Sequence, residues 1–342
     1  MDDLVFFYPT GHEAHYEPGH QERPERIEVI RKAFEKAGWW EKYPRLDPLT
    51  LPIKILQNIH SPEYLDYLRK ASTLGAPLDL DTYTTTATWE LALKSAGGAA
   101  AVGQYVWQRK AKRGFALTRP PGHHATHNRG MGFCLLNNIA LTAEFLIQEE
   151  RAQRLAIVDL DVHHGNGTQD IFSKRVEVLY ISTHQYPLYP GTGTINDHGA
   201  GIGHGTVINI PLPPFSGDEA YHSAMEKIII PALSRYMPEM ILGSVGFDSH
   251  WKDPLANELL SADEYGKLIS QLCNWADNFS GGKIALFLEG GYDLEAGVAC
   301  ALAVTSALLG QKWQDPLGPS PYQESTAWQS VIEEVCKIND LQ

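Results

Sequence analysis

Seven short apolar runs, rich in β-branched and aromatic residues, alternate with helical patterns along most of the chain. Apolar runs of this length are typical of strands that are buried on both faces. Strands that alternate with helices predict βαβ units, and therefore an α/β protein with a mainly parallel sheet between two layers of helices. The runs are Leu4–Tyr8, Gly114–Thr118, Leu155–Asp161, Val176–Thr183, Val207–Leu212, Met240–Gly246 and Lys283–Gly291.

The expected helices fill most of the gaps between these runs. Ser61 before Pro62 predicts an N-cap with proline at the first helical position, and Ser261 with Glu264 predicts a capping box. No low-complexity linker or internal repeat interrupts the alternation, so we expect a single domain over residues 1–342. The expected helices are Pro24–Ala37, Pro62–Lys70, Ala87–Gln108, Asn137–Glu150, Asp218–Tyr236, Ala262–Phe279 and Leu294–Leu309.

Composition excludes several classes of protein. The chain is 43% hydrophobic and 20% charged, and no apolar run approaches the roughly 20 residues of a membrane span. Its first residues lack the basic region of a signal peptide, so we expect a cytoplasmic protein. The net charge of −13 argues against direct nucleic-acid binding. The four cysteines show no CxxC spacing, so neither a disulfide framework nor a thiolate zinc site is predicted.

The segment LAIVDLDVHHGNGTQD, residues 155–170, carries the strongest chemical signal. Asp159, Asp161 and His163 are spaced by two at the end of a buried strand, so their side chains are expected on one side. Buried carboxylates are costly unless a cation or hydrogen-bond donors compensate them. The alternative is that the carboxylates cap a helix beginning after Gly165, but capping does not explain the neighbouring histidines.

Other polar side chains follow the ends of other predicted strands. Ligands of open parallel sheets bind beyond the carboxyl ends of the strands, so these groups are expected to meet in one pocket. They are His123 and His124 after the second run, the Asp159 group after the third, His184 after the fourth, Asp248 after the sixth and Tyr292 after the seventh.

Asp161, His163 and Asp248 form a predicted metal site. Three protein ligands with one open position are the pattern of catalytic zinc, and oxygen-rich ligation also admits Fe²⁺ or Mn²⁺. Zinc lowers the pKa of bound water to about 7 and polarises a carbonyl group, which suits amide hydrolysis.

Two further groups are expected to move protons near this metal. His123 and His124 would differ in basicity if Asp159 orients one ring and the uncharged Asn166 holds the other. Tyr292 follows a glycine pair that we expect to act as a hinge, and its phenol could donate to an oxyanion.

The motifs RPPGHHA, GFCLLNN, DLDVHHGNGTQ, YPGTG, GFDSH and EGGYD together resemble the histone deacetylase and acetylpolyamine amidohydrolase family, over nearly the whole chain. This resemblance implies a three-layer arginase-deacetylase fold with a mainly parallel, eight-stranded sheet. It also implies zinc-dependent removal of an acyl group from an amine.

The resemblance implies a role for each matching residue. The zinc ligands are again Asp161, His163 and Asp248. His124 matches the general base and later acid, His123 its electrostatic partner paired with Asp159, and Tyr292 the phenol that polarises the carbonyl. A potassium ion is also implied, held by Asp159, Ser182 and Thr183 with the carbonyl groups of Asp161 and His163.

Substrate contacts follow from the same resemblance. Phe133 and Tyr189 match the two aromatic walls of an acyl-lysine tunnel, with Gly132 beside them. Leu255 stands where polyamine-selective relatives carry a glutamate, which favours acyl-lysine over acetylpolyamine as the substrate. Asn166 and the segment ERPERI are similar to the class II branch of the family.

Two other functions remain as alternatives. Arginase-like enzymes need a second metal with bridging carboxylates, but the corresponding positions here hold Gly165 and His250. A catalytically silent module that binds acyl-lysine would have lost a chemical group, and none is missing. Acyl length, native metal and oligomeric state stay open.

Overall fold

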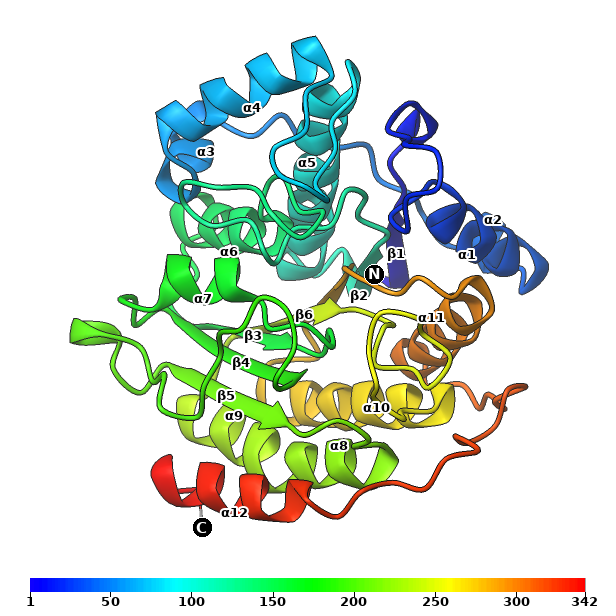
Figure 1. Cartoon of the computed structure of the whole chain (residues 1–342), viewed down its shortest axis with the longest axis vertical. Coiled ribbons are helices and arrows are strands. Elements are labelled where there is room, and N and C mark those ends of the chain that lie inside the picture. Colours follow the sequence, from blue (N-terminus) through cyan, green and yellow to red (C-terminus); the bar gives the residue numbers. More distant parts are fainter. Residues whose placement is uncertain (342) are drawn as a thin grey trace.

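Seven parallel strands form one sheet in the computed structural model, which describes residues 1–341 (Figure 1). Their order across the sheet is β1-β2-β7-β6-β3-β4-β5. All six neighbouring pairs are parallel, so every carboxyl end lies at the same edge. The strands are β1 (Asp2–Phe7), β2 (Ala111–Ala116), β3 (Leu155–Asp159), β4 (Val178–Gln185), β5 (Val207–Leu212), β6 (Met240–Val245) and β7 (Ile284–Leu288).

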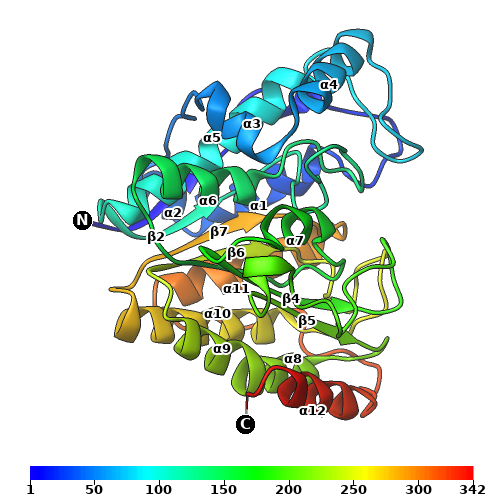
Figure 2. The same ribbon diagram turned by 90° about the vertical axis from the view of Figure 1, so that its left-hand side faces the viewer.

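Helices cover both faces of the sheet (Figure 2). Alternate residues of each strand enter different cores: Ala156 and Val158 of β3 pack on one face, and Leu155 and Ile157 on the other. The first core is closed by α1 (Glu25–Lys36), α2 (Trp39–Lys42), α8 (Asp218–Ala224), α9 (Ile230–Tyr236), α10 (Ala262–Phe279), α11 (Leu294–Leu308) and α12 (Trp328–Ile338). The second is closed by α3 (Ile53–Ile59), α4 (Pro62–Leu74), α5 (Thr88–Trp107), α6 (Asn138–Glu149) and α7 (Asn166–Phe172).

The predicted fold class is confirmed, but the expected eighth strand does not form within residues 1–341. Beside the edge strand β1, Phe6 donates to the carbonyl of Pro44 and accepts from the backbone N–H of Leu46, both at 2.9 Å. Arg45 thus makes a single parallel bridge to Phe6. The chain turns away after this bridge, so the pairing is too short to count as a strand.

The two predicted helix starts have different outcomes. Ser61 caps α4 as expected, because its side chain accepts from the backbone N–H of Tyr64. Ser261 likewise accepts from Glu264 N–H at the start of α10, but the return bond of a capping box is absent there. Asp218 accepts from the Ser261 N–H instead, while the carboxylate of Glu264 pairs with His222 and Lys267.

One expected helix is interrupted, and three others were not predicted. The segment Asp218–Tyr236 contains a π-helical turn, Met225–Ile229, between α8 and α9. Pro231 follows this turn, and proline cannot donate a backbone hydrogen bond inside a regular helix. The helices that were not predicted are α2, α3 and α12, whereas α7 begins after Gly165, at the position considered from the sequence. Among residues 1–341, no helix has the length and apolar character that crossing a membrane requires.

The strand order decides which residues can share a site. Strands β2, β7, β6 and β3 are consecutive neighbours in the sheet, although they are far apart in the sequence. Their carboxyl ends deliver the His123 loop, the Tyr292 turn, the Asp248 loop and the Asp161 loop to adjacent positions. Four of the five strand ends that were predicted to carry site residues therefore lie next to one another in the sheet.

Candidate active site

Asp161, His163 and Asp248 lie together at this edge of the sheet. The Nδ1 atom of His163 lies 3.2 Å from a carboxylate oxygen of Asp161 and 3.2 Å from one of Asp248. All three residues are buried, and their ligand atoms lie within 4.8 Å of one another. Strand β3 ends at Asp159, so this convergence is made by the following loop and not by the strand itself.

The loop after β3 is held by its own backbone and does not cap the next helix. The N–H of Asp161 donates to the carboxylate of Asp159, and the N–H of His163 donates to that of Asp161. Helix α7 begins after Gly165 without a side-chain cap. The helix-capping interpretation of these carboxylates is therefore wrong.

Glycines allow the two carboxylates to approach the neighbouring loops. A Cβ atom at Gly290 would lie 2.0 Å from Asp248 Oδ2, and one at Gly246 would lie 1.9 Å from Asp161 Oδ2. The backbone N–H of Gly290 also donates to Asp161 Oδ2 at 2.8 Å. Any side chain at these glycines would collide with the carboxylates.

The buried carboxylates of Asp161 and Asp248 favour a positive charge beside them. Burial by itself lowers the pKa of His163, but the carboxylates of Asp161 and Asp248 outweigh it and raise that pKa to about 10. The two carboxylates thus attract a positive charge to the position they share with His163 Nδ1. Two carboxylates and one imidazole are also a donor set that suits a divalent metal, so these residues fit one.

His123 is paired with a carboxylate, as predicted. Its Nδ1 donates to Asp159 Oδ2 at 3.2 Å. Burial lowers the pKa of His123, but Asp161 and Asp159 more than reverse this and raise it to about 10. The sequence did not point to Tyr180 of β4, whose hydroxyl lies 3.1 Å from the same Asp159 oxygen. Only the register of β3 against β4 brings this hydroxyl to Asp159.

His124 is held by an amide, also as predicted. Its Nδ1 lies 2.8 Å from Asn166 Oδ1, which can only accept a hydrogen bond. Burial, followed by the neighbouring His123 and His163, keeps the pKa of His124 well below its ordinary value. The ring of His124 is therefore neutral at pH 7, and its Nε2 carries a free lone pair.

Tyr292 is held by several contacts with its surroundings, and the expected glycine hinge stays a prediction. The preceding Gly291 has φ of +107°, and a Cβ there would lie 2.8 Å from Phe247. The backbone N–H of Tyr292 donates to Asp253 Oδ2 at 2.6 Å, and the guanidinium of Arg26 lies 4.7 Å from the ring centre. Neither the contact of Asp253 nor that of Arg26 was predicted from the sequence.

Three of the predicted substrate residues, Gly132, Phe133 and Tyr189, contact His124 or Tyr292. Phe133 meets the Tyr292 ring edge to face at 5.7 Å between centroids, and Tyr189 meets His124 in the same way at 5.2 Å. A Cβ on Gly132 would lie 2.5 Å from the His124 ring. Leu255 is linked to Tyr292 through Asp253: the backbone N–H groups of both residues donate to the Asp253 carboxylate.

The potassium site stays a prediction; its residues lie at the end of β3, in the loop that follows it, and in β4. Asp159 and Ser182 are partners in the register of β3 and β4. Side chains of consecutive strand residues leave opposite faces, so the hydroxyl of Thr183 points away from Ser182. His184 does not join the site, because its ring bonds to Ser182 and to the carbonyl of Gly193 and packs against His164.

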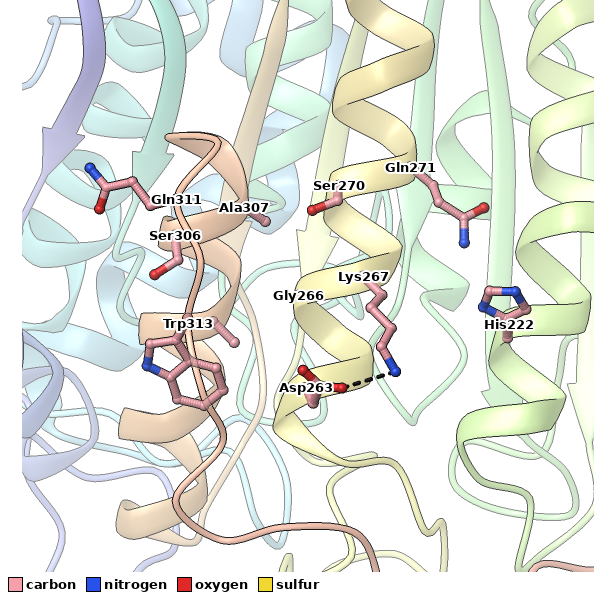
Figure 3. A pocket seen from close by; sticks show the side chains of 11 residues that line it. His222, Asp263, Gly266, Lys267, Ser270, Gln271, Ser306, Ala307, Gln311 and Trp313 are labelled. Atoms are coloured by element: carbon pink, nitrogen blue, oxygen red, sulfur yellow. Dashed lines mark ion pairs between the residues drawn. The ribbon is translucent and has the colours of Figure 1, made fainter.

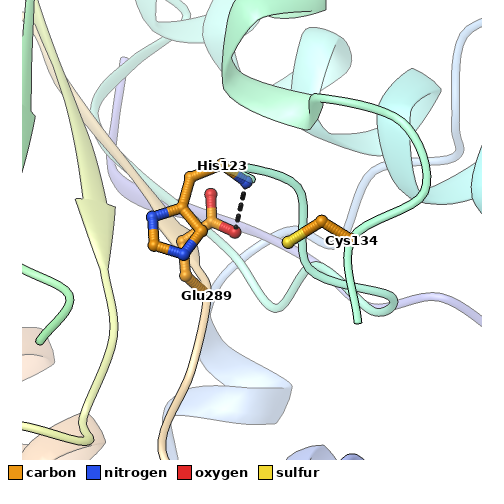
Figure 4. Close-up of side chains that lie close together, drawn as sticks. All are labelled: His123, Cys134 and Glu289. Atoms are coloured by element: carbon orange, nitrogen blue, oxygen red, sulfur yellow. Dashed lines mark hydrogen bonds between the residues drawn. The ribbon is translucent and has the colours of Figure 1, made fainter. Parts of the chain in front are cut away.

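Glu289 is a further carboxylate beside the site that the sequence analysis did not select. It accepts from the backbone N–H groups of Gly122 and His123 at 2.6 and 3.1 Å, and from the hydroxyl of Ser244 at 3.0 Å. Figure 4 shows it next to His123 and Cys134. Burial raises the pKa of Glu289 to about 7. Its position in the motif EGGYD, directly after β7, could have identified Glu289 from the sequence.

A separate cavity of about 370 Å³ lies between α8, α10 and α11 (Figure 3). His222, Lys267 and Trp313 are among its lining residues. None of the predicted site residues lines it. This cavity is thus not part of the candidate active site.

Comparison with known proteins agrees with this geometry. Residues 20–308 match the histone deacetylase domain. A protein of Archaeoglobus fulgidus named "Probable deacetylase" is 36% identical, with 94% of this chain and 90% of that protein covered. A histone deacetylase-like amidohydrolase of Pseudomonas aeruginosa is 35% identical, with 87% and 80% covered.

A solved structure supports the same assignment. The crystal structure of the HDA15 HD domain is similar with a TM-score of 0.91 and 32% sequence identity. The similarity covers 99% of this chain and 94% of that one. The chain therefore belongs to the histone deacetylase family and is a deacetylase, that is, a hydrolase.

Proposed function

We propose that this deacetylase is zinc-dependent and removes acetyl or other short acyl groups from the side-chain amine of lysine in proteins or peptides. The observation that carries the proposal is the position of His124. One ring nitrogen is fixed by Asn166, and the ring lies beside His163 of the predicted metal site, with 5.9 Å between ring centroids.

Asp161, His163 and Asp248 would hold the zinc ion, and Fe²⁺ or Mn²⁺ would fit the same donors. A zinc ion bound by such residues activates water at neutral pH and polarises a carbonyl group. The cation would also balance the two buried carboxylates, whose effect on His163 already favours a positive charge at this position.

His124 acts as the general base and then as the general acid. Because its Nδ1 donates to Asn166, its Nε2 can accept a proton from the attacking water and return it to the leaving amine. His123 acts differently, since the nearby carboxylates of Asp161 and Asp159 keep it protonated. Its positive charge next to His124 helps to keep His124 neutral before the reaction.

Tyr292 donates a hydrogen bond to the substrate carbonyl. Burial keeps the pKa of this phenol well above its ordinary value, so the proton stays on the hydroxyl at neutral pH. A donor that is fixed in advance stabilises the negative charge that develops on the carbonyl oxygen. Its fixed backbone, anchored by Asp253, fits this role.

Phe133 and Tyr189 are proposed to line a tunnel for the extended acyl-lysine arm, with Gly132 leaving room beside His124. The absence of an acidic side chain at Leu255 favours acyl-lysine over a cationic acetylpolyamine. An acetylpolyamine deacetylase remains the alternative, and a silent binding module is disfavoured because no catalytic group is missing. A potassium ion beside Asp159 is a further proposal, supported by the pairing of Asp159 with Ser182.

The location of the protein also stays a prediction. We expect the cytoplasm, although two of the similar plant proteins have names that include "chloroplastic".

One panel of substrates tests the proposed function. Metal-loaded protein is assayed on acetyl-lysine peptides, longer acyl-lysine peptides and acetylated polyamines, together with a His124→Ala variant. We expect the highest kcat/KM on short acyl-lysine peptides and a large loss of kcat in the variant. Preference for acetylpolyamines would overturn the substrate assignment, and an inactive parent would favour the binding module.

A further inference from the structure

A buried charged network lies behind the candidate active site. Glu22, in the loop before α1, has no exposed surface, and its carboxylate is shared between two arginines. It accepts from Nε and Nη2 of Arg119 at 2.7 and 3.0 Å, and from Nη1 of Arg26 at 3.3 Å. Both guanidinium groups are buried as well.

Arg119 connects Glu22 to the loop that carries the paired histidines. It directly precedes the segment Pro120–His124, which contains both rings. Its remaining N–H groups donate to the carbonyls of His12 and His15, each at 2.6 Å. Because all three nitrogens of this guanidinium donate hydrogen bonds, the start of the histidine loop cannot move without breaking several buried hydrogen bonds.

Arg26 connects the same carboxylate to the turn that carries Tyr292. Its Nε donates to the carbonyl of Gly291 at 2.6 Å, and its Nη2 donates to that of Glu289. The guanidinium carbon also lies 4.7 Å from the centre of the Tyr292 ring. The position of the Arg26 guanidinium therefore fixes both the turn before Tyr292 and the Tyr292 ring.

We propose that Glu22 is a positioning residue of the deacetylation reaction, which sets the placement of Tyr292 relative to His124. A single carboxylate joins the arginine of one catalytic loop to the arginine that holds the other. This inference rests on the roles proposed above for His124 and Tyr292. Glu22 itself does not touch the substrate.

The charge of Glu22 is essential to this role. Without it, two buried guanidinium groups would face each other with no carboxylate between them, and a buried pair that loses one partner is strongly destabilised. The nearby His15 cannot replace the carboxylate, because an imidazole carries no negative charge; burial lowers its pKa to about 4, so at neutral pH it is uncharged. The arginines would move apart, and a displacement of about 1 Å can cost on the order of 100-fold in rate.

Kinetics of matched variants test the proposal. Glu22→Gln keeps the size of the side chain and removes its charge, while Glu22→Asp keeps the charge on a shorter stem. Glu28→Gln is the control, because Glu28 lies on α1, the helix that carries Arg26, and its ion pair is with the exposed Lys32. On a short acyl-lysine peptide we expect kcat to fall about 100-fold in Glu22→Gln, with KM changed much less. Glu22→Asp should recover part of the loss, and the control should match the parent.

A double-mutant cycle separates positioning from general damage. If Glu22 acts through the placement of Tyr292, then Glu22→Gln should cost much less in a Tyr292→Phe background than in the parent. Equal losses in both backgrounds would overturn the proposal. It would also be overturned if the loss of kcat matched the loss of folded protein.

Crystal structures give a readout that does not need activity. In Glu22→Gln, or in Glu22→Asp if the first variant does not fold, the Tyr292 ring should be displaced relative to His124. An unmoved ring would contradict the role of Glu22. An inactive parent with a displaced ring in the variant would instead contradict only the proposed function.

Discussion

The Nδ1 atom of His124 lies 2.8 Å from the amide oxygen of Asn166, whereas the adjacent His123 faces the carboxylate of Asp159. Two neighbouring imidazoles thus have partners of different charge. The pKa of His123 is raised to about 10, although burial opposes this, and burial keeps the pKa of His124 well below its ordinary value. Only His124 is free to accept a proton at neutral pH.

Replacing the amide by a carboxylate should change the basicity of His124. In Asn166→Asp, the added negative charge favours the protonated ring and raises its pKa. The base must be deprotonated to act, so the acidic limb of the kcat/KM profile should move to higher pH, by about one unit. Asn278→Asp, at an exposed position on α10, is the control. An acidic limb that stays in place would rule out His124 as the base.

Removal of the Tyr292 hydroxyl should affect the reaction and not the fold. We expect Tyr292→Phe to lower kcat about 100- to 1,000-fold, as for the loss of one oxyanion donor. Its melting temperature should stay close to that of the parent, because the ring contacts with Phe133 and Arg26 are kept. Turnover equal to that of the parent would show that another group polarises the carbonyl.

Gly290 should be intolerant of even a methyl group. In Gly290→Ala the new Cβ would lie 2.0 Å from Asp248 Oδ2, so the carboxylate must move away from His163. We expect loss of metal binding, measured by titration calorimetry, together with loss of activity. Gly297→Ala on α11 is the matched control, because an added Cβ would meet no atom within 4 Å beyond its chain neighbours and the backbone of its own helix, and alanine favours a helix by about 1 kcal/mol. Normal metal affinity in Gly290→Ala would contradict the tight packing described here.

His60 should make stability depend on pH. It is fully buried, its Nε2 accepts from the N–H of Asn137, and its Nδ1 donates to the carbonyl of Thr126. Burial lowers its pKa to about 4 from 6.5. Since the unfolded chain binds the proton more readily, this contribution to stability is lost as pH falls from about 6.5 to about 4, by at most about 3 kcal/mol.

Urea unfolding at several pH values checks this prediction. In His60→Gln the free energy of unfolding should be lower at pH 7 and should fall less steeply below pH 6.5 than in the parent. His198→Gln, at a half-buried loop position, should keep the slope of the parent. Equal slopes in the parent and in His60→Gln would exclude protonation of His60 as a cause.

Much of the fold could be predicted because its signals are local. All seven apolar runs became strands, since buried parallel strands leave a continuous apolar pattern. The order of the strands could not be predicted in this way, because it depends on contacts between distant segments. The expected eighth strand came from family resemblance, whereas the chain keeps only one bridge at Arg45.

The candidate site shows the same division. Asp161, His163 and the paired histidines could be found because they stand next to strand ends in short motifs. Glu22 and Arg26 lie in the segment ERPERI, but their roles could not be predicted, since the sequence does not show which distant groups a buried arginine or glutamate contacts. His184 was predicted to join the site because of its position near a strand end. However, β4 lies on the far side of β3 from β6, and the ring of His184 packs against His164.

Metal content tests the central claim most directly. The parent and a His163→Ala variant are stripped with a chelator, reloaded with zinc, freed of excess metal and analysed by mass spectrometry alongside hydrolysis of an acetyl-lysine peptide. The account predicts one zinc ion per parent chain, activity that is lost and restored with that ion, and neither in the variant. Full hydrolysis by metal-free parent protein, or a need for two ions per chain, would contradict it.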